Sequence, residues 1–485
     1  MAWKEAAEPV LTRMPAVQRP EGHVPFKRKL MWTAGVLVLY FFLTNVTLWG
    51  LGGQGSDLFG RFRSILAGQS GSVMHLGIGP IVTASIVLQL LGGANLLGLD
   101  TNDPRDQVLY QGLQKLLVLV MIVLTGLPMV FSGFLPAGSV SIGGMSLEGS
   151  AVNWLLFAQI FIGGVLILYM DEIVSKWGVG SGIGLFIIAG VSQSLVGGII
   201  APGIISTSKG LIFVWFDIAM GRTEIGSIVG GEGVMNLLMD PVNLLPIATT
   251  IFIFAVVVYA ESVRVEIPLS HARVKGARGR FPVKLIYASV LPMILVRALQ
   301  ANIQFLGKIL NSQITAMPAW LGTYADGQPT GGLFWYLQPI QAPRQWMWWL
   351  GGASQDPWQI ILRVSIDLFI MIVGGAIFAI FWVETTDMGP EATARQIQNS
   401  GMQIPGFRQN VGVIEKVMER YIPHVSVIGG ALVGLLAVMA NMLGTIGGVS
   451  GTGLLLAVSI TYKIYEEIAE EQLMEMHPMM RQMFG

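Results

Sequence analysis

The chain has 485 residues, of which 53% are apolar and only 12% are charged; its mean hydropathy is +0.64 and its formal net charge is zero. An average soluble domain has about 25% charged residues, so this chain has too little polar surface to enclose its apolar residues and is predicted to be a membrane protein. It has no cysteine, which excludes disulfides, thiolate metal sites and cysteine nucleophiles.

Ten stretches are apolar and long enough to cross about 30 Å of hydrocarbon, and helices are expected because hydrocarbon satisfies no bare backbone group. The first stretch begins at Leu30, runs for about 22 residues and lacks a small-residue cleavage site, so it is predicted to stay in the protein as a span. The predicted fold class is an all-α polytopic membrane protein with ten transmembrane helices. In chain order the spans lie near residues 30–51, 74–97, 112–133, 151–171, 181–200, 243–262, 284–306, 358–383, 422–443 and 451–470.

The distribution of Lys and Arg predicts the orientation of these spans. If the N-terminus is cytoplasmic, 21 basic residues lie in inside segments and six in outside segments. Cytoplasmic loops carry such an excess, so both termini are predicted to be cytoplasmic. The predicted organisation is a cytoplasmic N-terminal segment 1–29, an N-terminal half 30–200, an external linker 201–242, a C-terminal half 243–470 and a cytoplasmic tail 471–485.

Three segments outside the spans have unusual compositions. The segment at about 57–69 is too polar to span the membrane and too apolar for a free loop, so it is predicted to fold back into the protein as a short helix. The cytoplasmic loops at about 261–283 and 384–421 are basic. Their charge agrees with the general excess of Lys and Arg on the inner side, and it also suits contact with a polyanion, either nucleic acid or anionic lipid.

The sequence Ser-Gly-x-Gly-Leu occurs twice, at Ser181–Leu185 and at Ser450–Leu454. Neither copy has the lysine of a phosphate-binding loop. An intramembrane serine protease is an alternative, because residues 448–451 have the pattern Gly-x-Ser-Gly and such an enzyme pairs its serine with a histidine base. The 61 glycines of the chain make a chance match expected, and His75 and His424, the histidines near span ends, are predicted to be interfacial. Each copy opens the last span of a set of five, and the two sets run in opposite directions, which favours two inverted repeats.

Inverted repeats fit either a secondary transporter or a channel. A transporter is expected to place ionisable residues near the midplane, and the candidates are Arg297, Arg363 and Asp367. Arg363 and Asp367 are four residues apart on one helix face and are predicted to pair with each other. The second, fifth and tenth spans have no acidic residue in their cores, and an interior of Ile, Leu, Val, Gly and Ser suits a hydrophobic constriction. These features favour a channel.

Seven segments, between about residues 9 and 480, resemble the SecY family of protein-conducting channels in its archaeal form, and they are similar to the alpha subunit of the eukaryotic endoplasmic-reticulum translocon. They are LGIGPIVTASIVLQLL, QGLQKLL, DEIVSKWGVGSGIGLFIIAGVSQ, YAESVRVEIPLSHARVKGARGRFPVKLIY, FWVETT, RYIP and SGTGLLLAVSITYKIYE. The resemblance implies two inverted halves of five helices with a short re-entrant plug helix.

The resemblance also implies a function. The chain would be the central pore-forming subunit of the Sec translocase in the cell membrane, and not an enzyme. It would move unfolded secretory proteins across the membrane and release apolar segments into lipid, co-translationally with the ribosome. Its implied partners are a SecE-like gamma subunit, a small beta subunit, the ribosome, signal sequences and nascent chains, and membrane lipid; no cofactor or metal is implied.

Site residues follow from the same resemblance, and their roles are expectations. It assigns no role to Arg297, Arg363 or Asp367, nor to the outer loops 201–242 and 307–357. The implied pore ring is Ile78, Val82, Ile183, Ile187, Ile294 and Leu456, the plug residues are Phe59, Phe62, Ile65 and Leu66, the lateral gate residues are Gln89 and Asn302, and the ribosome-binding residues are Arg273, Lys275, Arg278, Arg280, Arg395 and Arg408.

Overall fold

The structure is a computed structural model that describes most of the chain. The described ranges are residues 2–22, 24–53, 62–93, 97–98, 104–142, 145–201, 209–222, 244–271, 278–284, 291–314, 317–325, 327–350, 355–386, 388–399, 402–403 and 411–476.

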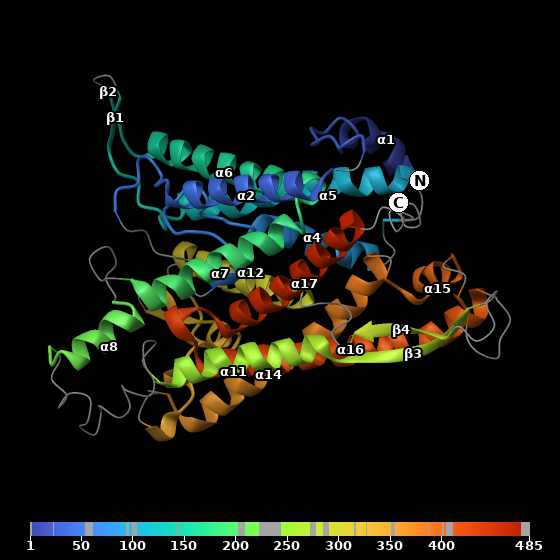
Figure 1. Cartoon of the computed structure of the whole chain (residues 1–485). Helices are drawn as coiled ribbons and strands as arrows, with labels where there is room; N and C mark the ends of the chain where they lie inside the picture. The colour runs from blue at the N-terminus through green and yellow to red at the C-terminus, as the bar shows by residue number, and fades with distance from the viewer. Residues whose placement is uncertain are drawn as a thin grey trace.

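Within these ranges, ten long helices form the body of the molecule, one for each predicted span (Figure 1). Seven of them, α5, α6, α7, α11, α12, α14 and α16, are long and apolar enough to cross a membrane by length and composition. Of the other three, α4 has 15 residues, α2 begins with a basic cluster and α17 ends with an acidic one. The bounds are α2 Phe26–Asn45, α4 Gly79–Gly93, α5 Pro104–Phe131, α6 Ser150–Trp177, α7 Gly182–Ile200, α11 Leu244–Ser262, α12 Leu291–Gln313, α14 Pro357–Thr385, α16 Val411–Leu443 and α17 Gly451–Met476.

Some helices extend beyond the predicted spans. Helix α5 begins at Pro104, α6 continues to Trp177 and α16 begins at Val411. Charged and polar residues are frequent in these added segments, and many of them are good helix formers such as Glu, Lys and Gln. Hydropathy therefore underestimates the length of these helices, because a helix can continue beyond the hydrocarbon layer.

The helix contacts repeat between the two halves of the chain. In the N-terminal half α2 packs on α6 and α7, α5 packs on α4 and α6, and α6 packs on α7. In the C-terminal half α11 packs on α16 and α17, α14 packs on α12 and α16, and α16 packs on α17. This is the same pattern in the same chain order, as two repeats of five helices require. The halves meet where α4 contacts α12 and α14, and where α7 contacts α17.

The shorter elements lie at the two ends of the helix bundle (Figure 1). One end, called here the α1 end, has α1 Ala2–Leu11, α15 Pro390–Asn399 and a sheet ordered β4-β3-β7, with β3 Arg264–His271, β4 Arg278–Lys284 and β7 Met402–Gln403. The opposite end, called the α8 end, has α8 Leu211–Ala219 and the hairpin of β1 Val140–Ile142 and β2 Met145–Leu147. Between α12 and α14 lie β5 Thr323–Ala325, β6 Gln328–Gly331, α13 Leu333–Tyr336, η2 Pro343–Gln345 and η3 Trp348–Leu350.

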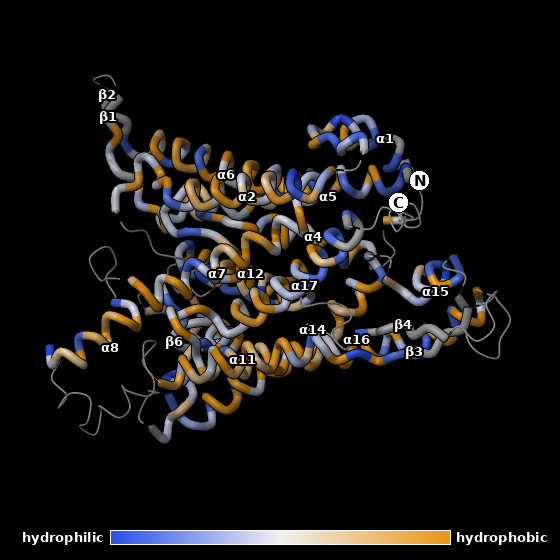
Figure 2. The backbone as a smooth tube through the Cα atoms, viewed as in Figure 1, coloured by the Kyte–Doolittle hydropathy of each residue, from blue (hydrophilic) through white to orange (hydrophobic). Residues whose placement is uncertain are grey.

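Polarity follows this arrangement. Apolar residues fill the long helices between the two ends, and hydrophilic residues gather at α1, α15 and β3 (Figure 2). One apolar cluster joins both halves. A second, at the α1 end, packs Ile267 of β3 against α14, α15 and α16, and so fixes the sheet to the helix bundle.

Candidate functional site

The six predicted ring residues come together in the core that joins the two halves. They lie at the starts of α4, α7, α12 and α17: Ile78 directly precedes α4, and the other five lie within the first two turns of their helices. Five are buried and Ile183 is partly buried, all in one apolar cluster. Branched aliphatic side chains offer no hydrogen bond to water, so a narrow passage lined by them excludes water and ions.

The predicted plug segment is described from Phe62 onward, and Phe59 lies outside the described residues. A short helix, α3 Arg63–Leu66, forms as predicted, and Phe62, Ile65 and Leu66 are buried in the same apolar cluster as the ring residues. The carbonyl oxygen of Leu66 accepts a hydrogen bond of 2.8 Å from the backbone N–H of Ile78. The segment therefore contacts a predicted ring residue directly.

Polar contacts hold α3 in place. The Oγ atoms of Ser64 and Ser450 lie 2.9 Å apart, and the Tyr40 hydroxyl donates to the carbonyl oxygen of Ala67 at 2.8 Å. The Arg63 guanidinium donates to the carbonyl oxygen of His75. His75, which was predicted to be interfacial, has a buried side chain, and its Nδ1 accepts from the N–H of Gly71 at 2.9 Å.

The two predicted gate residues contribute differently to the interface between the halves. Asn302 on α12 donates from Nδ2 to Oγ1 of Thr83 on α4, at 2.9 Å. Gln89 is buried, and its Oε1 has no hydrogen-bond partner among the described residues. It lines a cavity of about 410 Å³ whose walls come from α4, α5, α7, α12, α14 and α17. The ring residues Val82, Ile183 and Ile294 lie in the same walls.

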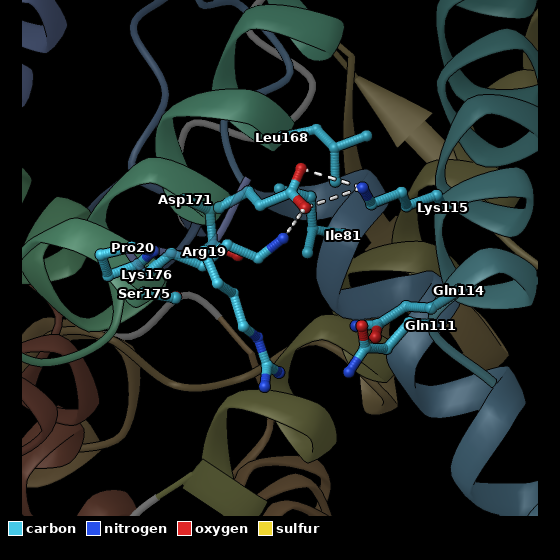
Figure 3. Close-up of a pocket in the computed structure, with 11 residues that line it drawn as sticks. Arg19, Pro20, Ile81, Gln111, Gln114, Lys115, Leu168, Asp171, Ser175 and Lys176 are labelled. Carbon is cyan, nitrogen blue, oxygen red and sulfur yellow. Dashed lines mark hydrogen bonds and ion pairs between the residues drawn. The ribbon is translucent and has the colours of Figure 1, made fainter. Parts of the chain in front are cut away.

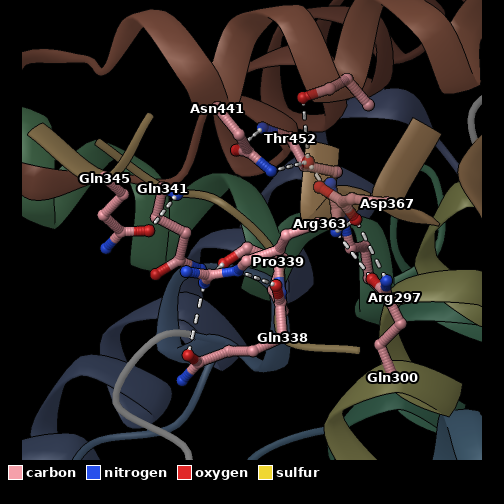
Figure 4. A network of polar contacts seen from close by, with 11 residues as sticks. Arg297, Gln300, Gln338, Pro339, Gln341, Gln345, Arg363, Asp367, Asn441 and Thr452 are labelled. Atoms are coloured by element: carbon pink, nitrogen blue, oxygen red, sulfur yellow. Dashed lines mark hydrogen bonds and ion pairs between the residues drawn. The ribbon is translucent and has the colours of Figure 1, made fainter. Parts of the chain in front are cut away.

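A buried ionic network crosses the C-terminal half (Figure 4). The predicted pairing of Arg363 with Asp367 was wrong. Asp367 accepts instead from Nη1 of Arg297 at 3.1 Å and from Nε2 of Gln300 at 3.1 Å. Arg363 donates to the carbonyl oxygen and the Oε1 of Gln338, at 3.1 and 3.3 Å, and its guanidinium lies 4.8 Å from the centre of the Trp335 ring.

A second cavity, of about 520 Å³, lies toward the α1 end of the N-terminal half, between α4, α5, α6 and residues 19–20 (Figure 3). Lys115 and Lys176 both bond the carboxylate of Glu172, with shortest distances of 2.8 and 2.6 Å. The same two lysines donate to the backbone oxygens of Pro15 and Val17. These bonds fix the N-terminal segment across the ends of α5 and α6.

The two basic loops are joined in the structure. Strands β3 and β4 form a hairpin from the first loop, and β7 of the second loop pairs with β3 at Ser270–Gln403 and His271–Met402. Sequence reasoning missed this sheet, although Val265, Ile267 and Leu269 recur at every second position of β3, the spacing of a strand. Arg395 on α15 is exposed and bonds Glu391 at 2.5 Å. Arg278 and Arg280 occupy alternate positions of β4, and Arg273, Lys275 and Arg408 lie outside the described residues.

Two inverted halves, an apolar constriction between them, a short helix packed on that constriction and a polar contact across one interface define a channel-type membrane protein. Comparison with known proteins agrees. The SecY family profile matches residues 72–465, and the profile "Plug domain of Sec61p" matches residues 38–71. The chain belongs to the SecY family, the central pore-forming subunits of the Sec protein translocase.

Relatives and solved structures are similar over nearly the whole chain. The protein translocase subunits SecY of Haloarcula marismortui and Halobacterium salinarum are 73% and 72% identical, with 100% of this chain and 100% and 99% of theirs covered. The solved structure of a protein-conducting channel is 38% identical, with a TM-score of 0.80 and coverage of 97% and 98%. Sec61 in a canine ribosome–channel complex is likewise 38% identical, with a TM-score of 0.77 and the same coverage. The secondary transporter and the protease are therefore not favoured.

Proposed function

We propose that the six ring residues form the narrowest point of the translocation channel and that the segment at 57–69 closes it when no chain is passing. The observation that carries this proposal is the position of α3, whose last residue, Leu66, accepts a hydrogen bond from Ile78 and whose Ser64 bonds Ser450. An unfolded chain of any sequence slides past aliphatic side chains without forming hydrogen bonds. An empty apolar constriction gates by dewetting.

The lateral gate opens between the pair α4–α5 and the pair α12–α14. Opening requires the hydrogen bond between Asn302 and Thr83 to break, and the cavity beside Gln89 receives the apolar part of a signal sequence. A signal sequence that binds only the open gate shifts the equilibrium toward it.

The α1 end faces the cytoplasm, in agreement with the unequal distribution of basic residues, and both termini lie on that side. The loops at 261–283 and 384–421 form one docking surface for the ribosome there, because β7 joins them. Its basic residues are Arg273, Lys275, Arg278, Arg280, Arg395 and Arg408, of which Arg395 contributes least because it is paired with Glu391. The canine relative was solved bound to a ribosome, which supports this proposal.

The chain acts as a channel subunit and not as an enzyme. Its energy comes from outside, from the ribosome during synthesis. Small gamma and beta subunits complete a heterotrimer. We keep the predicted domain limits as part of the proposal, with the plug inside the N-terminal half 30–200 and the ribosome-binding loops inside the C-terminal half 243–470.

Single-channel conductance in planar bilayers tests the proposal. The purified complex is compared with a variant that lacks residues 57–69. We expect an almost silent intact channel and a deletion variant that opens to large, poorly selective currents. If both remain silent while a small solute is taken up saturably, the plug-and-ring proposal fails and a transporter is favoured instead.

A further inference from the structure

The two helices that begin with Ser-Gly-x-Gly-Leu start in the same way. Ser181 is the N-cap of α7, and its Oγ accepts the N–H of Gly184 at 3.2 Å. Ser450 precedes α17, and its Oγ accepts the N–H of Gly453 at 3.1 Å. The first N–H groups of a helix have no hydrogen-bond acceptor inside the helix. In hydrocarbon no water can serve as the acceptor, so a side chain must do so.

The glycine after each serine lies against the backbone of the preceding long helix. A Cβ atom added to Gly182 would lie 2.5 Å from the Cα of Asp171 on α6. A Cβ atom added to Gly451 would lie 2.2 Å from the carbonyl carbon of Ala440 on α16. These close approaches require glycine, and they bring a side chain of the preceding helix to the start of the next one.

That side chain provides a second cap in both halves. Oδ1 of Asp171 accepts the N–H of Ile183 at 2.9 Å. Oδ1 of Asn441 accepts the N–H of Thr452 at 2.9 Å. Ile183 and Thr452 hold the same position in the two copies of the motif, so the two caps are related by the pseudo-symmetry of the halves.

The capped turns carry ring residues. Ile183 is itself a ring residue, and Ile187 follows it by four residues, about 6 Å along the helix axis. Leu456 follows Thr452 by the same four residues. A cap that fixes the first turn of either helix therefore fixes the height and the rotation of its ring side chains.

We propose that Asp171 and Asn441 are positioning residues of the pore, which hold α7 and α17 at the height and rotation that close the ring. This inference rests on the proposed function of the ring. It also explains why the motif occurs twice: the serine and the first glycine let a second cap reach the same backbone N–H in each half.

The two caps differ in the residues that surround them. Thr452 Oγ1 receives Nδ2 of Asn441 at 2.9 Å and Nε of Arg297 at 3.3 Å (Figure 4). Arg297 lies three residues after the ring residue Ile294 on α12, so the second cap links the ring positions of α12 and α17. Asp171 instead stands in the wall of the 520 Å³ cavity (Figure 3).

Leak through the resting channel tests the inference. Asp171→Leu and Asn441→Leu remove the acceptor oxygen, whereas Asp171→Asn keeps it. We expect each leucine variant to raise the open-time fraction of the plugged channel roughly five- to tenfold, the size expected for a lost helix cap. The acceptor-retaining Asp171→Asn variant should remain close to the wild type.

Three further variants separate the explanations. Gly430→Ala brings a Cβ atom to 2.5 Å from the carbonyl oxygen of Gly375, and so destabilises the α14–α16 contact without touching either cap. The inference is overturned if Gly430→Ala leaks as much as the leucine variants do when their melting temperatures fall equally. It is also overturned if Asp171→Asn leaks more than the wild type. Thr452→Val keeps the capped N–H but removes the Oγ1 that accepts from Asn441 and Arg297, so it reports on the contacts of the second cap if Asn441→Leu does not fold. Ile187→Ser tests the ring directly: if it does not leak, the proposed ring fails, and if it leaks while the leucine variants do not, only the caps fail.

Discussion

Asn302 and Thr83 are 219 residues apart in the sequence, yet their side chains form a 2.9 Å hydrogen bond that joins α12 to α4. Side-chain hydrogen bonds between membrane helices contribute about 0.6 kcal/mol on average and up to about 1.7 kcal/mol. Because this bond lies at the interface proposed to open, its loss should favour the open gate. We expect Asn302→Leu and Thr83→Val each to increase export of a cargo with a shortened apolar signal by roughly three- to tenfold.

The double variant Asn302→Leu/Thr83→Val provides the control. If the two side chains act through their mutual bond, the double variant should export the weak cargo no better than the stronger single variant. Additive effects would mean that each residue acts on the gate through other contacts.

The hydroxyl contact between Ser64 and Ser450 gives a second prediction, about closure. Ser64→Ala removes one hydrogen bond of about 1 kcal/mol between α3 and the start of α17. Ser450→Ala removes the same bond and also the N-cap contact with Gly453, so it should have the larger effect. We expect a higher frequency of brief openings in bilayer recordings, in the order wild type, Ser64→Ala, Ser450→Ala. Ser365→Ala is the matched control, because that exposed hydroxyl bonds the carbonyl oxygen of Ile361 in its own helix; an equal effect of the control would contradict the assignment.

The pairing of Arg297 with Asp367 predicts that replacing one of the two residues lowers the stability of the protein much more than replacing both. Both side chains are only 1% exposed. Removing one partner leaves the other charge buried and uncompensated, which costs about 3–5 kcal/mol. Asp367→Leu should therefore unfold at a much lower temperature than the wild type in detergent, and Arg297→Met/Asp367→Leu should recover most of the loss. A double variant as unstable as Asp367→Leu would mean that the pair contributes more than compensation of charge.

The fold could be predicted from the sequence because its main signals are local. Each of the ten helices contains a predominantly apolar run, and every run became a helix. Partners distant in the sequence were not predicted. Arg363 was the only basic residue within one turn of Asp367, so it was chosen, whereas the true partner, Arg297, lies 70 residues earlier on another helix.

The residues of the candidate site likewise fall into those that the sequence could predict and those that it could not. Ring residues such as Ile183 and Leu456 were named by resemblance to a family, because an apolar residue in a membrane helix carries no signal of its own. Thr83 and Tyr40 were missed, since a hydroxyl in a span gives no indication of which helix it will face. The two copies of Ser-Gly-x-Gly-Leu were visible, but their capping role depends on Asp171 and Asn441, which lie outside the motif.

The packing of α1 against α5 gives a prediction about the N-terminus. A Cβ atom added to Gly112 would lie 2.7 Å from the carbonyl oxygen of Leu11 and 2.9 Å from its Cβ. Gly112→Ala should therefore release α1 from α5. A spin label at Val10→Cys, which is 57% exposed in a chain without other cysteines, should become more mobile. Gly35→Ala is the control, since no atom lies within 4 Å of the added carbon; an immobile label in Gly112→Ala would contradict the contact.

The same label reports a pH dependence. Arg105 donates to the carboxylate of Glu8, at 2.6 Å from Nη2 and 3.2 Å from Nε, and this hydrogen bond holds the pKa of Glu8 below its ordinary value. A lowered pKa in the docked state means that the bond contributes fully above the ordinary carboxyl range and is lost as the pH falls through the docked-state pKa. The label at residue 10 should therefore stay immobile from neutral pH to below about pH 4.3, the ordinary value for a glutamate, and become mobile only at lower pH. Arg105→Gln should shift this release to a higher pH. Because the carboxylate of Asp106 also joins α5 to α1, through its ion pair with Lys4, both proteins should carry Lys4→Gln; a release that does not move with Arg105→Gln would assign the effect to another group.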